Sequence, residues 1–386
     1  MFFLLPFIML LSAASFKQST VSNVSGEIKF VKKVITTEKY ESAGVADIDQ
    51  DGISDIISGA YWYKGPDFIT KNFIYQPYAF EDYYDDFSTI LKDVNSDSYP
   101  DIITGGWWGE TLRWIENPGK NITPWKLHDV YKCGNVETTR EWDIDGDGFP
   151  EIVPNTPSKA IAFYELLRGK NGKTTGKFNR YQVAPVQGHG LGCGDINGDG
   201  RKDLVSANGW FEAPANIFKG KWVFHTDFDL GLASVPIIVT DVNKDGINDL
   251  IVGQAHDYGL NWYEQKLTVN NTRKWIKHSI DSTVSQFHEM QWVDLDGDGK
   301  PELLSGKRYR AHQEKDPGSL DPLGIYYYKW EGNSFVKHII SFGPKGEGKG
   351  IGIFMSVVDL RGTGRKDIVA AGKDGLCIFY NEGNSK

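Results

Sequence analysis

The stretch DLDGDGKPE, from Asp294 to Glu302, decides the fold of this chain, and the apolar pair Leu303 and Leu304 follows it directly. It places side-chain oxygens at alternate positions, then a glycine that permits a tight bend, and then a final carboxylate. Such a loop suits a hard cation with about six to eight oxygen ligands, Ca²⁺ above all. An EF-hand would have a longer loop between two helices, whereas here a strand-like run follows at once. The EF-hand interpretation is therefore excluded.

The same nine-residue phrase recurs along the chain. Its seven copies span residues 47–55, 93–101, 143–151, 195–203, 241–249, 294–302 and 359–367, about fifty residues apart. A fixed period of this length indicates a repeat architecture.

Each repeat follows one pattern of four strands. A short alternating strand enters the acidic loop, and an apolar strand such as 55–59 leaves it. An aromatic strand such as 112–116 comes next, and then an outer strand such as 275–280. Four strands in each of seven units predict an all-β fold, a seven-bladed β-propeller, as a single domain over residues 28–381.

The two ends of the chain predict how the ring closes. The last repeat stops after its third strand, residues 376–380, while residues 29–35 (KFVKKVI) have the outer-strand pattern. We expect this N-terminal strand to complete the last blade, which removes exposed sheet edges.

The acidic loops predict several structural Ca²⁺ ions. Oxygen-bearing side chains occupy the first, third, fifth and ninth positions of the first six copies. The predicted calcium ligands are Asp47, Asp49, Asp51, Asp55, Asp93, Asn95, Asp97, Asp101, Asp143, Asp145, Asp147, Glu151, Asp195, Asn197, Asp199, Asp203, Asp241, Asn243, Asp245, Asp249, Asp294, Asp296, Asp298 and Glu302.

The N-terminus and the composition bound the cellular role. Residues 1–15, MFFLLPFIMLLSAAS, form an apolar run of signal-peptide length that ends in small residues, so we expect a secreted or periplasmic protein with no stable membrane insertion after signal removal. The formal net charge of −9 argues against a nucleic-acid partner.

These residues resemble a known family. The acidic loops are similar to those of FG-GAP/VCBS repeat propellers, and the resemblance covers essentially residues 28–381. The seventh copy departs from the pattern, because Arg361 and Thr363 replace two ligands. Arg361 can supply there the positive charge that a metal ion would bring.

A second set of residues maps to the face opposite the acidic loops. His189, His256, His288 and His312 all fall there, at starts of first strands or in loops between second and third strands. We predict a transition-metal site, Zn²⁺ or another divalent ion, on His189, His256 and His288. The alternative is that these histidines are independent hydrogen-bonding groups in a sugar-binding cleft.

The same map predicts substrate and catalytic groups. The predicted substrate-binding residues are Glu137, Arg140, Trp107, Trp108, Trp210, Tyr258 and Lys307. The predicted catalytic residues are His288, Tyr309, His312, Arg308 and Arg310. Basic groups suit a carboxylate or an enolate, a tyrosine or histidine can transfer a proton, and exposed aromatic rings can stack on sugars.

A narrower resemblance concerns function. Residues 136–155, 188–210, 253–265, 287–312 and 314–318 are similar to the propeller of aldos-2-ulose dehydratase and its relatives, although the cupin-like C-terminal region of the fungal enzyme is lacking. This resemblance implies a carbon–oxygen lyase that performs metal-assisted β-elimination on a uronate- or keto-sugar-containing carbohydrate. The alternative is a non-catalytic calcium propeller that binds glycan or protein. A glycoside hydrolase would need two carboxylates across a cleft, and the candidates Glu41 and Glu137 come from nonadjacent blades.

Overall fold

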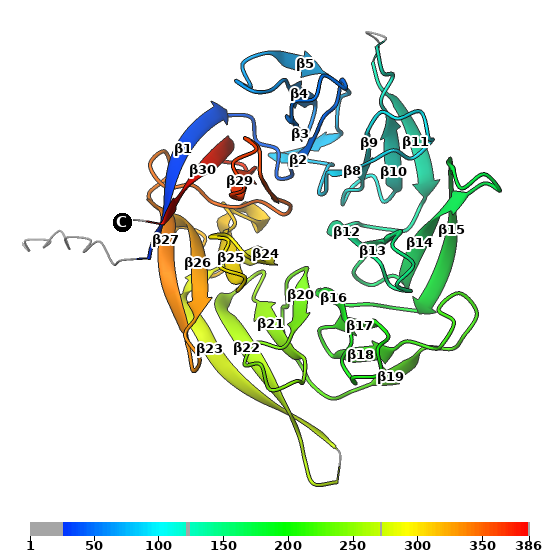
Figure 1. The fold of residues 1–386 in the computed structure, drawn as a ribbon, viewed down its shortest axis with the longest axis vertical. Helices are drawn as coiled ribbons and strands as arrows, with labels where there is room; N and C mark the ends of the chain where they lie inside the picture. Colours follow the sequence, from blue (N-terminus) through cyan, green and yellow to red (C-terminus); the bar gives the residue numbers. More distant parts are fainter. Residues whose placement is uncertain (1–25, 121–123, 271, 385–386) are drawn as a thin grey trace, which may run out of the picture.

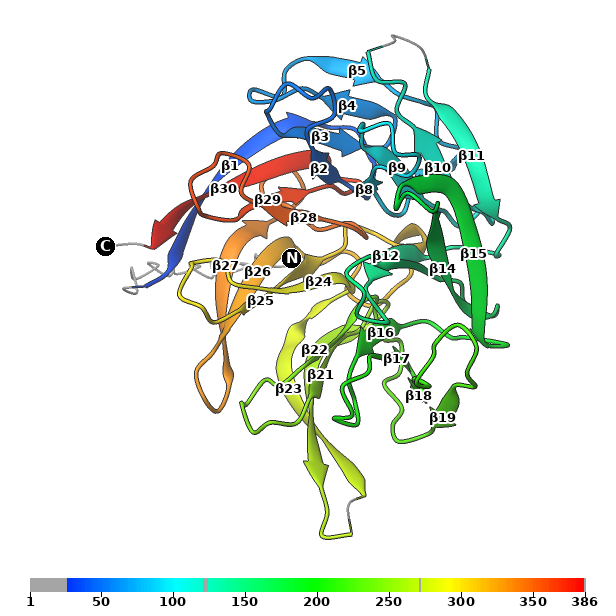
Figure 2. The ribbon, with the colours of Figure 1, turned by 45° about the vertical axis from the view of Figure 1, so that its right-hand side comes forward.

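In the computed structural model, which describes residues 26–120, 124–270 and 272–384, groups of four strands surround a central axis (Figures 1 and 2). The predicted signal peptide, residues 1–15, lies outside the described residues. Within the described part of the chain, no helix is long and apolar enough to span a membrane.

The strands pair in sequence order within each group. The first half of the ring consists of β2 (Gly44–Ala46), β3 (Asp55–Ser58), β4 (Tyr61–Tyr63) and β5 (Lys71–Phe73), then β8 (Ile90–Lys92), β9 (Asp101–Thr104), β10 (Leu112–Glu116) and β11 (Lys126–Tyr131), then β12 (Thr138–Trp142), β13 (Glu151–Asn155), β14 (Ile161–Arg168) and β15 (Thr174–Ala184). A small hairpin of β6 (Ala79–Phe80) and β7 (Tyr83–Tyr84) lies between the first two groups.

The second half continues the pattern. It consists of β16 (Leu191–Gly194), β17 (Asp203–Ser206), β18 (Gly209–Glu212) and β19 (Val223–His225), then β20 (Ile237–Thr240), β21 (Asp249–Gly253), β22 (Tyr258–Leu267) and β23 (Arg273–Ser285), then β24 (Phe287–Val293), β25 (Glu302–Lys307), β26 (Leu323–Trp330) and β27 (Phe335–Gly343). A parallel pairing of β16 with β20 joins two of these groups into one sheet. One 3₁₀ turn, η1 (His312–Glu314), follows β25.

The last group combines both ends of the described chain. It holds β28 (Ser356–Val358), β29 (Asp367–Ala370) and β30 (Leu376–Asn384), and β1 (Ile28–Thr36) pairs with β30 in antiparallel register (Figure 1). The pairing runs from Ile28 opposite Asn384 to Thr36 opposite Leu376.

Burial explains why the pattern folds this way. The second strands, such as β3 and β13, are buried along their whole length, whereas outer strands such as β1 alternate between covered and exposed positions. The core lies between neighbouring groups, where Val153 and Phe163 pack against Leu204 and Phe211. The chain is therefore all-β, and four-stranded units around an axis are the arrangement of a β-propeller.

A histidine on the outer strand, with a partner on the neighbouring strand, recurs in several of these groups. Each of the outer-strand histidines His128, His225 and His278 stacks on a tryptophan of the neighbouring strand and bonds a glutamate through Nε2. His338 stacks on Tyr327 in the same way. These histidines belong to the repeat rather than to a site.

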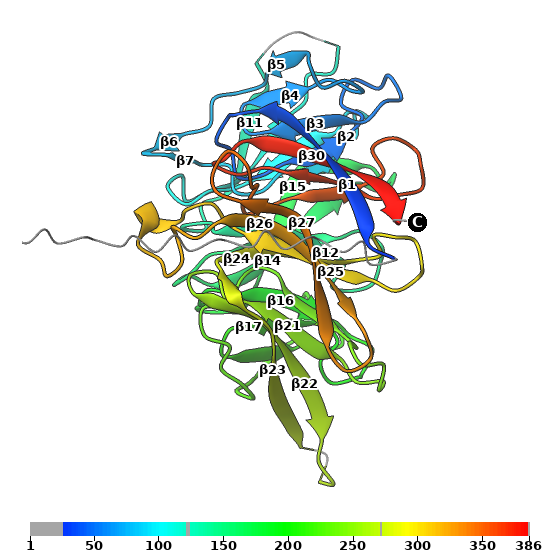
Figure 3. The same cartoon turned by 90° about the vertical axis from the view of Figure 1, so that its left-hand side faces the viewer.

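The loops divide between two faces. Each acidic loop joins the first and second strands of a group, so the segments before the first strands and after the second strands lie at the other end. The β6–β7 hairpin projects from this other face, as the edge-on view shows (Figure 3).

Candidate functional site

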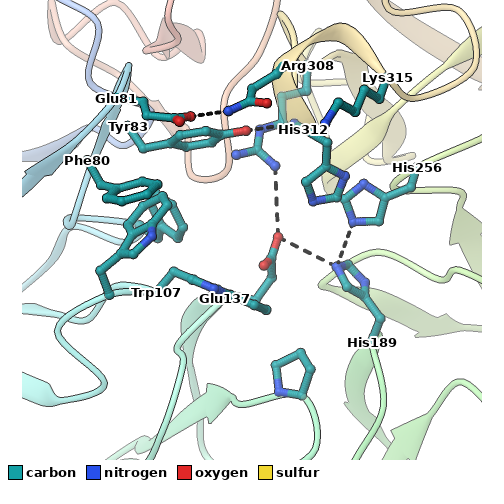
Figure 4. Close-up of a pocket in the computed structure, with 14 residues that line it drawn as sticks. Phe80, Glu81, Tyr83, Trp107, Glu137, His189, His256, Arg308, His312 and Lys315 are labelled. Atoms are coloured by element: carbon teal, nitrogen blue, oxygen red, sulfur yellow. Dashed lines mark hydrogen bonds and ion pairs between the residues drawn. The ribbon is translucent and has the colours of Figure 1, made fainter.

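A cavity of about 530 Å³, here called the mouth cavity, lies on the face opposite the acidic loops (Figure 4). It is lined by Phe80, Glu81, Tyr83, Phe87, Trp107, Trp108, Glu137, Pro157, His189, His256, Arg308, His312, Gln313 and Lys315. The lining comes from the β6–β7 hairpin, from segments before first strands, and from loops after second strands. Seven of the residues predicted for the site are among them.

His189 and His256 present the same ring nitrogen, Nε2, to each other at 3.2 Å. Behind them, His189 Nδ1 donates to the Ala233 carbonyl oxygen at 2.7 Å, and His256 Nδ1 donates to Asp316 Oδ2 at 3.0 Å. Carbonyl and carboxylate oxygens only accept hydrogen bonds, so both rings carry a proton on Nδ1 and direct an Nε2 lone pair inward. Two lone pairs face each other at this distance only when a cation, either a proton or a metal ion, lies between them.

Glu137 completes this pair. Its Oε1 lies 3.6 Å from His189 Nε2, and the potential ligand atoms of Glu137, His189 and His256 all lie within 4.8 Å of one another. Burial raises the pKa of Glu137, but nearby His189 and Arg308 outweigh burial and hold this pKa at about 2. Burial lowers the pKa of His189, but Glu137 outweighs it and raises that pKa above its ordinary value. The carboxylate of Glu137 is therefore held in its charged form beside His189.

His312 and Asp316 form a second pair at the same cavity. Asp316 Oδ1 accepts from His312 Nδ1 at 3.0 Å, while its Oδ2 accepts from His256. Burial raises the pKa of Asp316, but these two hydrogen bonds outweigh burial and lower it. The rings of His256 and His312 stack with centroids 4.4 Å apart. His312 is half exposed, and its Nδ1 is engaged by Asp316 while its Nε2 stays available at the cavity.

His288, predicted as a metal ligand and catalytic group, does not belong to the cluster of Glu137, His189 and His256. Its Nε2 accepts a hydrogen bond from Arg308 Nη1 at 3.1 Å, because arginine only donates. Its Nδ1 faces Glu137 Oε1 at 3.7 Å. Burial, and then the charge of Arg308, place the pKa of His288 well below its ordinary value. The lone pair that would bind a metal ion is already used.

Arg308 lines the cavity, but most of its guanidinium is engaged. Nε donates to Glu41 Oε1 at 2.7 Å and Nη2 to Glu41 Oε2 at 3.0 Å. This bidentate pair balances the charge of Arg308. It also occupies Glu41, so the two-carboxylate hydrolase interpretation loses one of its candidates.

Aromatic side chains form the opposite wall of the mouth cavity. Trp108 stacks on Phe80 with centroids 5.1 Å apart and packs against Tyr83 and Phe87. Trp107 lies beside them (Figure 4). This wall places flat apolar surface across from the ionisable groups.

The wall is tied to the loop that carries His312. The His312 backbone N–H donates to Tyr83 Oη at 2.7 Å, Arg310 Nη2 donates to Asp82 at 2.7 Å, and Gln313 bonds Glu81. These contacts join segments about 230 residues apart and fix both sides of the cavity relative to each other.

Three residues of the stretch 307–310 have other environments than predicted. Lys307 is buried in a separate cavity of about 370 Å³, where Nζ donates to Ser285 and Gln286, so it does not line the mouth. Tyr309 packs against Lys345, whose Nζ lies 5.1 Å from the ring centroid. Arg310 is paired with Asp82 and Glu314. Neither Tyr309 nor Arg310 is among the residues that line the mouth cavity, and their predicted catalytic roles stay predictions.

Three residues predicted to bind substrate also lie elsewhere. Trp210 is fully buried in the core, because its position in β18 faces inward. Arg140 is buried near the axis, where it pairs with Glu289 and belongs to a cavity on the other side. Tyr258 is exposed but bonds Asp321 at 2.5 Å. The structure therefore does not bring Trp210, Arg140 and Tyr258 to the lining of the mouth cavity.

Several residues that line the mouth cavity were not predicted from the sequence. The β6–β7 hairpin contributes Phe80, Glu81 and Tyr83, and the long loop contributes Gln313 and Lys315. The connection between β5 and β8 is longer than a tight turn and rich in aromatic and acidic residues, and this was the signal that could have identified it.

The acidic loops use several of their carboxylates for backbone hydrogen bonds. In the first loop, Asp55 Oδ2 accepts from Ile48 N–H at 3.0 Å and Oδ1 from Gly65 N–H at 2.7 Å. Asp47 accepts from the N–H groups of Asp51 and Gly52. The loops 93–101, 195–203 and 241–249 repeat these bonds. These hydrogen bonds therefore stabilise the acidic loop whether or not a cation is bound.

The donor set of these loops fits a cation. Three groups have potential ligand atoms within 4.8 Å of one another: Asp47, Asp49 and Asp55; Asp143, Asp145 and Glu151; and Asp294, Asp296 and Glu302. Asp49 Oδ1 and Asp143 Oδ1 are buried without a hydrogen-bond partner among the described residues. Burial raises the pKa of Glu151 and of Glu302 to about 7. The predicted calcium ligands stay a prediction.

Basic side chains lie beside several loops. Lys64 contacts Asp49 and Asp51, Lys266 contacts Asp245, and Lys329 contacts Asp296. In the seventh loop, Arg361 Nη2 contacts Asp367 at 3.1 Å, and Nη1 contacts Glu382 at 2.8 Å. The guanidinium of Arg361 therefore lies where the other loops gather carboxylates.

Comparison with known proteins agrees with the repeat pattern. Residues 143–206 and 241–305 match the family model of the FG-GAP-like repeat. The chain carries FG-GAP-like repeats. No curated protein matches the chain.

Solved structures show likeness of fold. A chain in the crystal structure of BBS1N in complex with ARL6DN has a TM-score of 0.50 at 12% identity, covering 92% of this chain and 97% of that one. A chain of the exotype rhamnogalacturonan lyase YesX has a TM-score of 0.48 at 12% identity, covering 94% of this chain and 75% of that one. At this identity the first likeness concerns the fold alone, and the second carries no argument about function.

Proposed function

We propose that this chain is a metal-dependent, carbohydrate-active lyase whose active site is the mouth cavity. The observation that carries the proposal is the approach of His189 Nε2 and His256 Nε2 to 3.2 Å beside Glu137, across from an aromatic wall. A protein that only binds a ligand does not need two imidazoles arranged in this way, with both Nδ1 atoms hydrogen-bonded and both Nε2 atoms directed toward each other.

Glu137, His189 and His256 would hold a divalent ion, Zn²⁺ or a similar metal. One carboxylate and two imidazoles are typical of catalytic zinc sites that keep a position for substrate. The hydrogen bonds of His189 to Ala233 and of His256 to Asp316 are outer contacts of the kind that orient metal ligands. When bound, such an ion polarises a carbonyl or carboxylate oxygen.

The cavity suits a sugar that carries a carboxylate or a carbonyl group. Its volume of about 530 Å³ is in the range of small-ligand sites, and Trp107 and Trp108 offer flat faces to a sugar ring. Arg308 is already balanced by Glu41. A bound metal ion, with Lys315 at the rim, would therefore attract the anionic or polarised group of a uronate or keto-sugar.

His312 is the residue placed for the proton transfer of a β-elimination. Asp316 holds its Nδ1, and its Nε2 can take a proton from the carbon next to the carbonyl or carboxylate. The C–H electron pair then forms the new double bond, and the oxygen on the β-carbon leaves with its bonding pair and takes up a proton.

The architecture supports a wider proposal about the scaffold. The pairing of β1 with β30 supports a seven-bladed ring closed by the N-terminal strand over residues 28–381. Calcium in the first six acidic loops would stabilise it, and secretion or export to the periplasm would supply that calcium. The apolar N-terminal run and the acidic loops support both statements.

The test is turnover by full-length protein stripped of metal and reloaded with Zn²⁺, Mn²⁺ or Ca²⁺ alone. Uronate-containing oligosaccharides and keto-sugars are screened for the ultraviolet absorbance of a conjugated elimination product. We expect turnover only after reloading with a transition metal, and none in His189→Ala. Sugar binding with no turnover under any metal would overturn the enzyme and leave a glycan-binding propeller.

A further inference from the structure

Two buried residues outside the mouth cavity connect to it through hydrogen bonds. Lys307 Nζ donates to Gln286 Oε1 at 2.7 Å, and Gln286 Nε2 donates to Asp316 Oδ2 at 3.2 Å. Asp316 in turn accepts from His256 Nδ1 and His312 Nδ1, both at 3.0 Å. A continuous chain of polar contacts therefore runs from Lys307 to two histidines of the cavity.

The direction of every bond in this chain is fixed by its first member. A lysine ammonium only donates, so the amide oxygen of Gln286 must face Lys307. The amide nitrogen must then face Asp316, which as a carboxylate only accepts. Lys307 thus orients the amide of Gln286, and the amide nitrogen of Gln286 in turn fixes the position of the Asp316 carboxylate.

Gln286 is held in place by its surroundings. It is fully buried, and its φ of 61° lies in the left-handed region that L residues seldom adopt. Its N–H donates to the Asp257 carbonyl at 3.0 Å, and its own carbonyl accepts from Arg308 N–H at 2.9 Å. Such a conformation persists only where neighbouring contacts impose it, and it is common near functional sites.

We propose that Lys307 and Gln286 are positioning residues that, through Asp316, fix His256 and His312 in the Nδ1–H tautomer. With the protons held on Nδ1, both rings present Nε2 to the mouth cavity, one for a metal ion and one as a base. The consequence for metal binding rests on the proposed function, but the tautomers themselves do not.

The test observes the tautomers directly, by nitrogen NMR of full-length protein labelled with ¹⁵N in its histidines, without metal or substrate. The variants are Lys307→Met and Gln286→Met, which keep the length of the side chain and remove its hydrogen bonds. Lys349→Met is the matched control, because Lys349 is also a buried lysine but bonds Gly350 and Asp374 instead.

The protein supplies its own reference signals. His128, His225 and His278 bond glutamates through Nε2, the opposite nitrogen, and none of them contacts Asp316. In Lys307→Met and Gln286→Met we expect His256 and His312 to become mixtures of tautomers while these three stay unchanged. Unchanged reference signals also show that the variants are folded.

Metal binding gives a second readout. We expect Zn²⁺ affinity in both variants to fall by about 10- to 100-fold, the usual effect of removing an outer partner of a metal ligand. Pure Nδ1–H tautomers of His256 and His312 in both folded variants would overturn the inference, even if the wild type is an active lyase. A tautomer change in a protein that shows neither Zn²⁺ binding nor turnover would support the positioning role and overturn the proposed enzyme.

Discussion

The acidic loops and the mouth cavity lie at opposite ends of the same strands, yet they are assembled in different ways. Each acidic loop takes its carboxylates from one continuous stretch, as between Asp47 and Asp55. The cavity takes Glu137, His189 and His256 from three separate units of the ring. Repetition therefore copies scaffold chemistry many times, whereas the unique chemistry arises where irregular loops of different repeats meet.

The two regions also treat buried charge differently. In the first acidic loop, both oxygens of Asp55 accept backbone N–H groups, and the same bonds recur in later loops. At the mouth, charge is balanced by long-range partners such as Glu41 with Arg308. Loss of a bound cation should therefore lower the stability of the fold at the acidic loops and the catalytic activity at the mouth cavity.

Calcium removal should produce the largest effect, and it should be on stability. Binding to the folded form alone adds about 2.7 kcal/mol per site at a hundredfold excess over Kd, so several loops together should shift the melting temperature strongly. We expect excess chelator to lower the melting temperature followed by circular dichroism, and Ca²⁺ to restore it.

The seventh loop provides the control for this prediction. Arg361→Ala removes the guanidinium that contacts Asp367 and should lower the melting temperature with and without calcium alike. A melting curve that is the same in calcium and in chelator would contradict the assignment of the loops to calcium.

Substitution in the cluster of Glu137, His189 and His256 should affect turnover rather than stability. His189→Ala and His256→Ala each remove an imidazole, and a metal ion supplies several kcal/mol to the transition state, so turnover should fall by about a thousandfold or more. The calcium-dependent melting temperature should change little. His225→Ala, at a repeat histidine, is the control, and it should affect stability but not turnover.

A smaller loss is expected at the base. His312→Ala should lower kcat by about 10²- to 10⁴-fold, as for other general bases, and leave Zn²⁺ binding by the cluster intact. His278→Ala, at a repeat histidine that does not line the cavity, should leave kcat nearly unchanged. Full activity of His312→Ala would move the base to another residue.

The same contrast explains what could be predicted from the sequence. The acidic loop between β2 and β3, and the pairing partner of β1, follow from patterns within a few residues. His189, His256 and His312 could be placed on one face because their positions within the repeat are regular.

The errors concern contacts between distant segments. His288 occupies the predicted face, but nothing local showed that Arg308 would use its Nε2. Trp210 is predicted to bind substrate, yet it lies in β18 and packs in the core. The β6–β7 hairpin was missed because it interrupts the repeat, and a site wall formed by an insertion has no counterpart in the other copies.

The smallest expected effect concerns the buried carboxyl of Asp86, which contrasts with Asp55, whose two oxygens both accept backbone N–H groups. Asp86 is fully buried near the mouth, and neither of its side-chain oxygens has a hydrogen-bond partner among the described residues. Burial, followed by the charges of Glu41 and Asp85, raises its pKa well above the ordinary value.

A carboxyl with a raised folded-state pKa is neutral in both the folded and the unfolded state below about pH 4, so it does not lower the free energy of unfolding there. As the pH rises further, the unfolded chain ionises first, and folding loses stability until the folded pKa is reached. Asp86→Asn should remove this loss and increase the free energy of unfolding at neutral pH, with no gain from this source near pH 4, as measured by urea unfolding at both values. Asp85→Asn is the control and should be destabilising, because the Asp85 carboxylate accepts from the N–H groups of Trp108 and Gly109. An equal gain at both pH values would show that the effect of Asp86→Asn comes from packing rather than from the buried charge.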